Sequence, residues 1–160
     1  MDLQARLRNP AAILAVSLAA ALLFTLLVIT QFEGSVRIFW LYYHVPISIP
    51  FVAFAIDRGN SWARTGPAHL GVDVVVLVFS LLRAFMALPL ISGHTLFLAY
   101  ALLSTDVWAV RLTAALVLLE VVSIKVFIWH DPTLVGGLVA GGVAAVVYRN
   151  IKHRYSPQIG

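Results

Sequence analysis

The sequence predicts an all-α membrane protein, a polytopic bundle of about six transmembrane helices forming a single domain over residues 1–160. Hydrophobic residues make up 61% of the 160 residues, whereas charged residues make up only 11%. The mean hydropathy is +0.95, and a soluble domain of this length could not hide so much apolar surface. Four apolar tracts are long enough to cross a bilayer, and proline, glycine and polar residues separate them.

The first two spans are expected at residues 11–32 and 36–56. The first tract contains no charged residue and, at about 22 residues, is long enough to cross a bilayer. A polar sequence follows it where a signal peptide would have a small-residue cleavage site, so we expect a retained span. The second tract carries His44, Pro46 and Pro50, and its prolines free backbone carbonyls that neighbours or water must satisfy.

Four further helices are expected in the rest of the chain. A polar loop is expected at 57–67, a third span at 69–88, a turn at 89–94 and a short fourth helix at 95–103. A fifth span is expected at 107–129 and a sixth at 134–148. The cap-like sequence Ser104-Thr105-Asp106 should open the fifth span. The fourth helix is too short to cross about 30 Å unless it begins near Pro89 or the bilayer is thinned. Small residues on the sixth span allow close packing between helices, at Gly136, Gly137, Gly141 and Gly142.

The distribution of basic residues predicts the orientation. An even number of spans places both termini on one side, and most of the basic residues fall on that side. The opposite side receives Arg37, Arg83 and Lys125. By the positive-inside rule we expect both termini in the cytoplasm, with the protein in the plasma (inner) membrane. The basic residues counted on the cytoplasmic side are Arg6, Arg8, Arg58, Arg64, Arg111, Arg149, Lys152 and Arg154.

The amino-acid composition limits the kinds of binding partner that we expect. The sequence has no basic patch with interleaved aromatic residues, so no nucleic-acid partner is expected. The absence of cysteine excludes disulfides and thiolate metal sites. The expected partners are the lipid bilayer and a lipid phosphate substrate, and a homo-oligomer or a larger membrane complex remains open.

Ionisable side chains interrupt the apolar tracts, and such groups need a partner or a wet cavity in hydrocarbon. At 1.5 Å per residue, His44, Arg83 and Glu120 should lie at a similar depth, roughly 12–15 Å below the outer boundary. We expect Arg83 and Glu120 to form an ion pair, since Lys125 would point about 140° away from Glu120 on a regular helix. Groups near the mouth complete one outward-facing polar funnel: Ser92, His94, Lys125, His130 and Asp131.

The third span adds a polar stripe to the funnel. His69, Asp73, Ser80 and Arg83 share one helical face, which should point into the bundle. For His69 and Asp73 a structural role is expected. A purely structural role, in which buried charges only fix helix register, stays open for the Arg83–Glu120 pair as well.

An anion site is expected where Ser92 and Gly93 open a helix, because the N–H groups of a first helical turn lack helical partners. His94 would stand beside the bound anion, with His130 and Asp131 in another turn across the funnel. Arg83 and Lys125 would supply positive charge. Two histidines, a carboxylate and cations around an anion suit phosphoryl transfer, in which one histidine attacks phosphorus and the other protonates the leaving oxygen.

These segments carry a family resemblance. Ser92-Gly93-His94 resembles the second motif, proline-serine-glycine-histidine, of the type 2 phosphatidic acid phosphatase superfamily. Ser123, followed seven residues later by His130 and then by a glycine-rich helix, resembles its third motif. The resemblance implies His130 as nucleophile, His94 as general acid, and hydrolysis of a lipid phosphate or pyrophosphate at the outer face without a cofactor. Ile124 stands here at the position of the family's motif-three arginine and Leu134 at that of its orienting aspartate, so Lys125 and Asp131 would act from displaced positions.

Two other classes of function remain open. An intramembrane metal protein, with zinc or another divalent metal, could use His44, Glu120, His94, His130 and Asp131 as ligands, and two of the histidines could clamp haem. A noncatalytic carrier or membrane subunit would use the same funnel to bind a lipid head group or an ion.

In the phosphatase hypothesis, the residues expected to bind the substrate are Arg83, Ser92, Gly93, Lys125 and Ser123.

Overall fold

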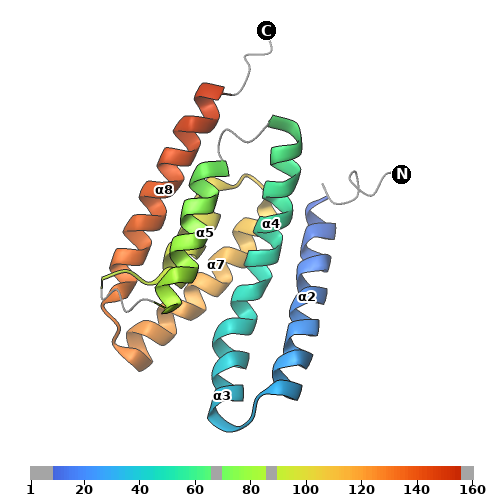
Figure 1. Ribbon diagram of the computed structural model, residues 1–160, viewed down its shortest axis with the longest axis vertical. Coiled ribbons are helices and arrows are strands. Elements are labelled where there is room, and N and C mark those ends of the chain that lie inside the picture. The colour runs from blue at the N-terminus through green and yellow to red at the C-terminus, as the bar shows by residue number, and fades with distance from the viewer. Residues whose placement is uncertain (1–8, 66–69, 86–89, 156–160) are drawn as a thin grey trace.

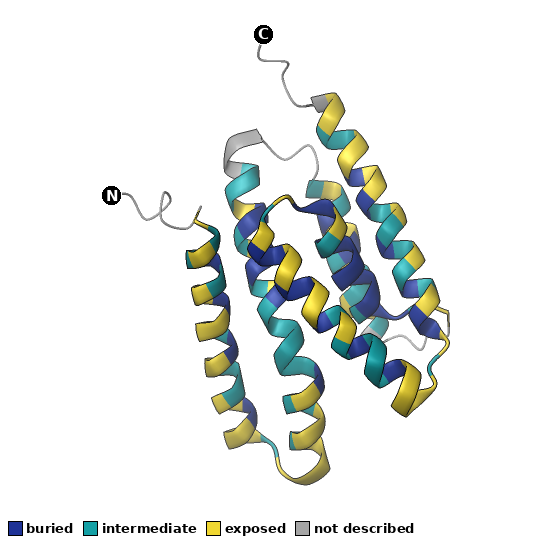
Figure 2. Ribbon diagram, turned by 180° about the vertical axis from the view of Figure 1, so that it is seen from behind, coloured by how far each residue is buried: buried dark blue, intermediate teal, exposed yellow. Residues whose placement is uncertain are grey.

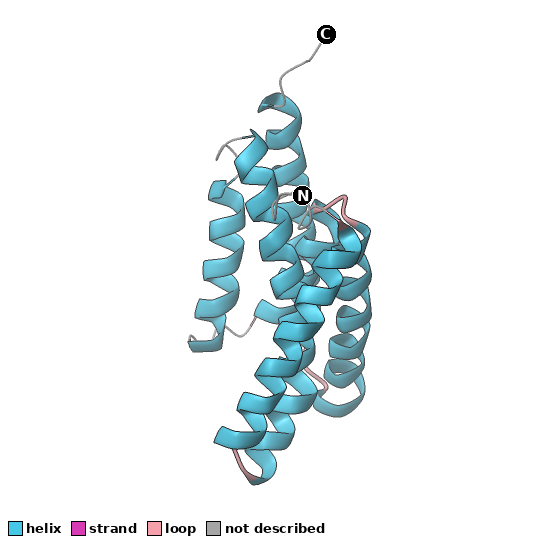
Figure 3. Ribbon diagram, turned by 90° about the vertical axis from the view of Figure 1, so that its right-hand side faces the viewer, coloured by secondary structure: helices cyan, strands magenta, loops and turns pink. Residues whose placement is uncertain are grey.

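A computed structural model describes residues 9–65, 70–85 and 90–155, with side chains described at 9–62, 70–83 and 90–154. Arg6, Arg8, His69 and Pro89 lie outside these ranges, as does the side chain of Arg64. Every regular element in the described ranges is a helix (Figure 3), and α7 crosses the bundle obliquely in the views of Figures 1 and 2. This confirms the all-α fold class.

The helices form an up-and-down bundle (Figure 1). In chain order they are α2 (Pro10–Gln31), α3 (Gly34–Phe39), the π-helix η1 (Trp40–His44), α4 (Val45–Thr65), α5 (Leu70–Phe85), α6 (Gly93–Ser104), α7 (Trp108–Ser123), the π-helix η3 (Ile124–Trp129) and α8 (Thr133–Tyr155). The first turn of α2 and the last turn of α8 lie at the same end of the bundle, which we call the terminal end. The opposite end, with the turns at 32–33, 90–92 and 130–132, is called the distal end.

Four helical stretches are long and apolar enough to span a membrane, which indicates a membrane protein. They are Pro10–Gln31, Gly34–Trp62, Trp108–Trp129 and Thr133–Arg154, and they correspond to the expected first, second, fifth and sixth spans. The described part of α5 is 16 residues long and α6 is 12 residues long. Large apolar side chains cover the outer faces of the long helices, as lipid contact requires (Figure 2).

The α6 helix is the centre of the bundle. It packs against α8 and α7 and also contacts α5 and α4. Most of its side chains are buried, including Leu98, Tyr100 and Ala101, which have no exposed surface. A helix that is apolar on all sides belongs in a core, so its short length reflects burial within the bundle.

Glycines let α8 approach α6 closely. A Cβ added at Gly137 would lie 1.9 Å from the Thr95 hydroxyl, and one added at Gly141 would lie 2.4 Å from the Leu96 carbonyl oxygen. A Cβ at Gly136 would meet the backbone of the turn before α6, whereas one at Gly142 would meet nothing within 4 Å. The predicted packing role is therefore confirmed for three of the four glycines.

The expected polar loop at 57–67 is wrong, because α4 continues as a helix to Thr65. Arg58 is only 3% exposed and points into the bundle. Its guanidinium donates from Nε to Asp73 Oδ1 (3.1 Å), from Nη1 to the Tyr148 hydroxyl (2.8 Å) and from Nη2 to Ser104 Oγ (2.5 Å). These partners lie on α5, α8 and α6, so one side chain ties four helices together.

Asp73 completes this buried network. Its carboxylate has no exposed surface and accepts hydrogen bonds from the Tyr100 hydroxyl (2.6 Å) and Trp62 Nε1 (3.4 Å) as well as from Arg58. The structural role expected for Asp73 fits these contacts. With its charge paired and hydrogen-bonded, the carboxylate can stay ionised within an apolar bundle.

The expected cap at 104–106 is also wrong. The N-cap of α7 is Val107, which makes no side-chain capping hydrogen bond. The Thr105 hydroxyl accepts from the Val107 N–H (3.1 Å) but donates to the buried carboxylate of Asp57 (2.7 Å). The Ser104 hydroxyl accepts a hydrogen bond from Arg58 Nη2. These hydroxyls therefore satisfy buried ionic groups of the neighbouring helices.

Candidate functional site

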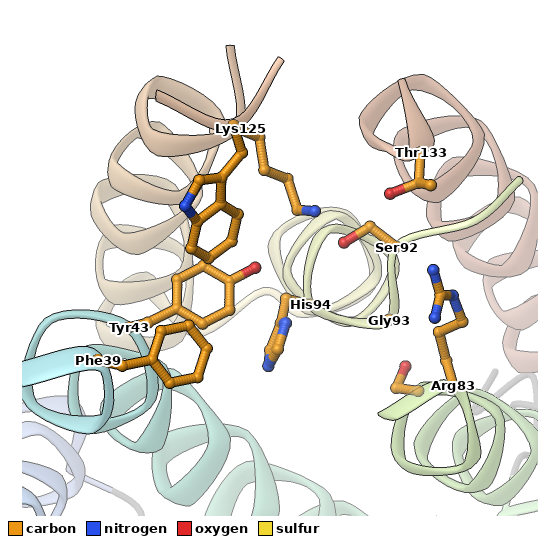
Figure 4. A pocket seen from close by; sticks show the side chains of 10 residues that line it. Phe39, Tyr43, Arg83, Ser92, Gly93, His94, Lys125 and Thr133 are labelled. Atoms are coloured by element: carbon orange, nitrogen blue, oxygen red, sulfur yellow. The ribbon is translucent and has the colours of Figure 1, made fainter. Parts of the chain in front are cut away.

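A polar pocket of about 190 Å³ lies at the distal end of the bundle, above the first turn of α6. Figure 4 looks along the α6 axis and shows the side chains standing around it. They come from α3, η1, α5, η3, α8 and the turn before α6, so stretches distant in sequence meet here. The lining residues are Phe39, Tyr43, Ser80, Arg83, Ser92, Gly93, His94, Lys125, Trp129 and Thr133.

The first turn of α6 forms the floor of this pocket. Ser92 is the N-cap of α6, which begins at Gly93 and not at the expected residue 95, and the Ser92 hydroxyl accepts from the Thr95 N–H at 3.5 Å. The Ser92 N–H donates to the Thr133 carbonyl (3.0 Å), which fixes the turn against α8. A Cβ at Gly93 would lie 2.4 Å from the Ser80 carbonyl oxygen, so glycine is required for this approach to α5. The Thr95 N–H is capped by Ser92, whereas the N–H groups of Gly93 and His94, which line the pocket, lack i−4 partners within the helix.

Arg83 brings positive charge to the α5 side of the pocket. Its Nε donates to the Ile91 carbonyl oxygen at 2.6 Å and so holds the turn that leads into α6. The predicted ion pair between Arg83 and Glu120 is wrong. The α5 helix packs on α6 and α8, whereas α7 packs on α6, α4 and α2, so α6 separates the two side chains.

Lys125 brings a second cation from η3. Its side chain is 5% exposed, and its ammonium forms an ion pair with Asp131. The other carboxylate oxygen of Asp131 accepts from the Thr133 N–H at 2.9 Å, at the start of α8. Burial alone would raise the pKa of Asp131, but the hydrogen bonds from Lys125 and from the Thr133 N–H outweigh burial and lower this pKa to about 2. Asp131 is therefore ionised at neutral pH.

The structure brings two of the predicted histidines together. The ring centroids of His44 and His94 are 5.4 Å apart, and the Tyr43 ring stands 4.7 Å from His94 in an edge-on arrangement. His94 lines the polar pocket, whereas His44 lines the apolar cavity beside it. The two rings therefore lie at the boundary between a polar and an apolar environment.

Three predicted site residues lie away from this pocket. His130 is exposed, in a left-handed turn with φ 50° that ends η3. The Ser123 hydroxyl donates to the Leu119 carbonyl (2.8 Å) within its own helix. Glu120 lies partly exposed on α7, and none of the hydrogen bonds or ion pairs among the described residues involves it. Within the same residues, no group of three His, Asp or Glu side chains is placed to hold a metal ion.

Two buried hydroxyls in the pocket make no hydrogen bond of ordinary geometry in the described part of the chain, although that of Thr133 lies near enough to the Asp131 carboxylate to help lower the pKa of Asp131. They are Ser80 Oγ and Thr133 Oγ1, and Thr133 is 7% exposed. A buried hydroxyl without a hydrogen bond costs about 1–3 kcal/mol, so such groups point to a missing polar partner. No pattern in the sequence singled out Thr133, whereas Ser80 belongs to the polar stripe predicted on α5.

The pocket is thus suited to an anion. Arg83 and Lys125 line it, the latter paired with Asp131, and the positive end of the α6 dipole and the buried hydroxyls of Ser80 and Thr133 lie beside them. Comparisons of the chain with protein-family models, with curated proteins and with solved structures gave no match.

Proposed function

We propose that this protein binds a phosphate-bearing ligand at the distal end of the bundle, with the phosphate in the pocket above α6. The single observation that carries the proposal is the pair of buried hydroxyls on Ser80 and Thr133, two residues that line this pocket, which make no hydrogen bond of ordinary geometry in the described part of the chain. A phosphate oxygen would accept from both. The Arg83 and Lys125 charges and the free N–H groups of the α6 first turn would offset the charge of the phosphate.

The decisive experiment uses a variant that removes one hydroxyl without changing shape. Thr133→Val should weaken binding of inorganic phosphate about tenfold or more, since a hydrogen bond to a charged group is worth about 1.5–3 kcal/mol. The same change should leave the melting temperature nearly unchanged, because the Thr133 hydroxyl makes no hydrogen bond of ordinary geometry to the described residues. Weaker binding without lost stability distinguishes a ligand contact from a structural one.

The matched control is Thr113→Val. Thr113 is equally buried on α7, but its hydroxyl already donates to the Ala109 carbonyl at 2.9 Å, far from the pocket lining. This variant should lose some stability and keep its phosphate affinity. If inorganic phosphate does not bind the purified protein, or binds wild type and Thr133→Val equally, the proposal is refuted.

Hydrolysis of a lipid phosphate is the second candidate function. The observation that favours it is the Lys125–Asp131 ion pair, which connects the turn that carries His130 to the pocket that contains His94. In this hypothesis His130 attacks phosphorus and His94 protonates the leaving oxygen. Release of phosphate from a lipid phosphate, lost in both His94→Ala and His130→Ala, would support hydrolysis. Binding without turnover in wild type would instead support a carrier or subunit.

We also propose that the chain crosses the plasma (inner) membrane with both termini in the cytoplasm. Arg111, Arg149 and Lys152 lie near the terminal end of the bundle and support this orientation. Arg58 is buried, so its charge does not support this orientation. The chain has no cysteine, so single cysteines can be introduced and labelled without background. In inside-out vesicles a cysteine near Lys152 should react with an impermeant maleimide, whereas one at Gly34 should not, and the reverse pattern would refute the orientation.

A further inference from the structure

A second cavity adjoins the polar pocket and differs from it in chemistry. It has a volume of about 350 Å³, within the range of small-molecule sites, and its lining is almost entirely apolar. The two cavities share Ser80, Gly93 and His94, so they meet directly over the first turn of α6. The apolar residues that distinguish the second cavity include Phe24, Trp40, Ile47, Phe51, Leu77 and Phe97.

The apolar cavity forms a groove that faces the bilayer. Its walls come from α4 and α5, with Phe24 of α2 and the rings of η1 at one side, and α6 forms its floor. Phe51 on one wall is 39% exposed and Leu81 on the other is 57% exposed. In a membrane, a groove with such walls is open to hydrocarbon from the side.

Aromatic rings mark the boundary between the groove and the pocket. His94 stands against His44 at 5.4 Å, and His44 stands against Trp40 at 4.4 Å, measured between ring centroids. Rings with an apolar body and a polar edge suit a position where an environment changes from apolar to polar. A ligand that occupied both cavities would need the same change in polarity along its length.

Resting on the proposed phosphate site, we infer that the ligand is an amphiphile whose apolar chain occupies the groove between α4 and α5. The chain enters sideways from the bilayer, and the phosphate reaches the α6 first turn past His94. Lipid chains are as apolar as leucine side chains, so moving a chain from the bilayer into the groove changes its hydrophobic free energy little. The affinity therefore comes from the phosphate, and the groove supplies the path and the orientation.

The test is photolabelling of the purified protein in detergent with hexadecyl phosphate that carries a diazirine at mid-chain. Adducts are expected on groove residues such as Ile47, Phe51 and Leu77, and excess unlabelled hexadecyl phosphate should suppress them. Adducts confined to outward-facing positions such as Val75, which is 65% exposed, would overturn the inference. Groove adducts that excess ligand does not suppress would overturn it as well.

A blocked groove provides the matched comparison. Leu77→Trp should fill the groove and reduce the suppressible adducts several-fold, while inorganic phosphate still binds as in wild type. Val75→Trp adds the same side chain on the exposed side of α5 and should leave both the suppressible adducts and the binding of inorganic phosphate unchanged. Labelling of the groove that persists in Leu77→Trp would refute the inference. If inorganic phosphate fails to bind wild type, the proposed function fails, whereas intact phosphate binding without groove labelling removes the chain site alone.

Discussion

Replacing Arg58 should destabilise the bundle more than replacing any exposed basic residue. Arg58→Met removes the Nε contact to Asp73 and the Nη contacts to Tyr148 and Ser104. It also leaves the Asp73 carboxylate, which has no exposed surface, without its charged partner. Removing one partner of a buried ion pair costs about 3–5 kcal/mol, mainly because the remaining charge stays buried. We expect a loss of stability in that range.

The assay is reversible unfolding in mixed micelles, followed by helical circular dichroism. The control is Arg111→Met, because the Arg111 pair with Asp106 is exposed and such pairs contribute about 0–1 kcal/mol. In the double variant Arg58→Met/Asp73→Asn, neutralising the carboxylate should restore part of the loss. A stability of Arg58→Met close to that of Arg111→Met, or strictly additive effects in the double variant, would refute the reasoning.

Three further predictions concern helix packing, pH and an unpaired carboxylate. Gly141→Ala should lose about 1–3 kcal/mol of stability because its Cβ would clash with the α6 backbone, whereas Gly142→Ala, with open space, should lose none; unfolding of the two variants compares them directly. The pKa of Asp131 is lowered, so the stability from its pair with Lys125 is present above about pH 4 and is lost as the pH falls toward about 2. An acid titration of stability should show this loss in wild type and not in Asp131→Asn. Glu120→Gln should unfold no more easily than wild type, because no described partner is lost and a neutral amide is less costly in hydrocarbon; clear destabilisation would contradict this.

Much of the distal pocket could be predicted from sequence because local rules position it. Ser92 was recognised as the start of a helix, and the small residues of α8 indicated close packing with a neighbour. Of the three residues expected at a common depth, Arg83 and His44 line adjoining cavities, whereas Glu120 lines neither. Hydrophobic pattern, capping preference and helix length were sufficient for these features.

The remaining features depend on which helices are neighbours, which a sequence pattern does not reveal. Asp57 and Arg58 beside Gly59 have the composition of a loop, yet partners on other helices let them stay within α4. Depth alone suggested that Arg83 and Glu120 would pair, but α6 lies between their helices. The turn at His130 and Asp131 was expected, but the π-helix η3 and the left-handed conformation of His130, which precede the Asp131 partner of Lys125, were not.

The most direct test of the phosphate site is equilibrium binding of inorganic phosphate to the purified protein and to Ser80→Ala. The matched control is Ser17→Ala, since Ser17 is fully buried but its hydroxyl already donates to the Ile13 carbonyl at 2.8 Å. The proposal predicts saturable binding to wild type and to Ser17→Ala, and markedly weaker binding to Ser80→Ala without a lower melting temperature. Undetectable binding to wild type, or equal affinity in all three proteins, would contradict it.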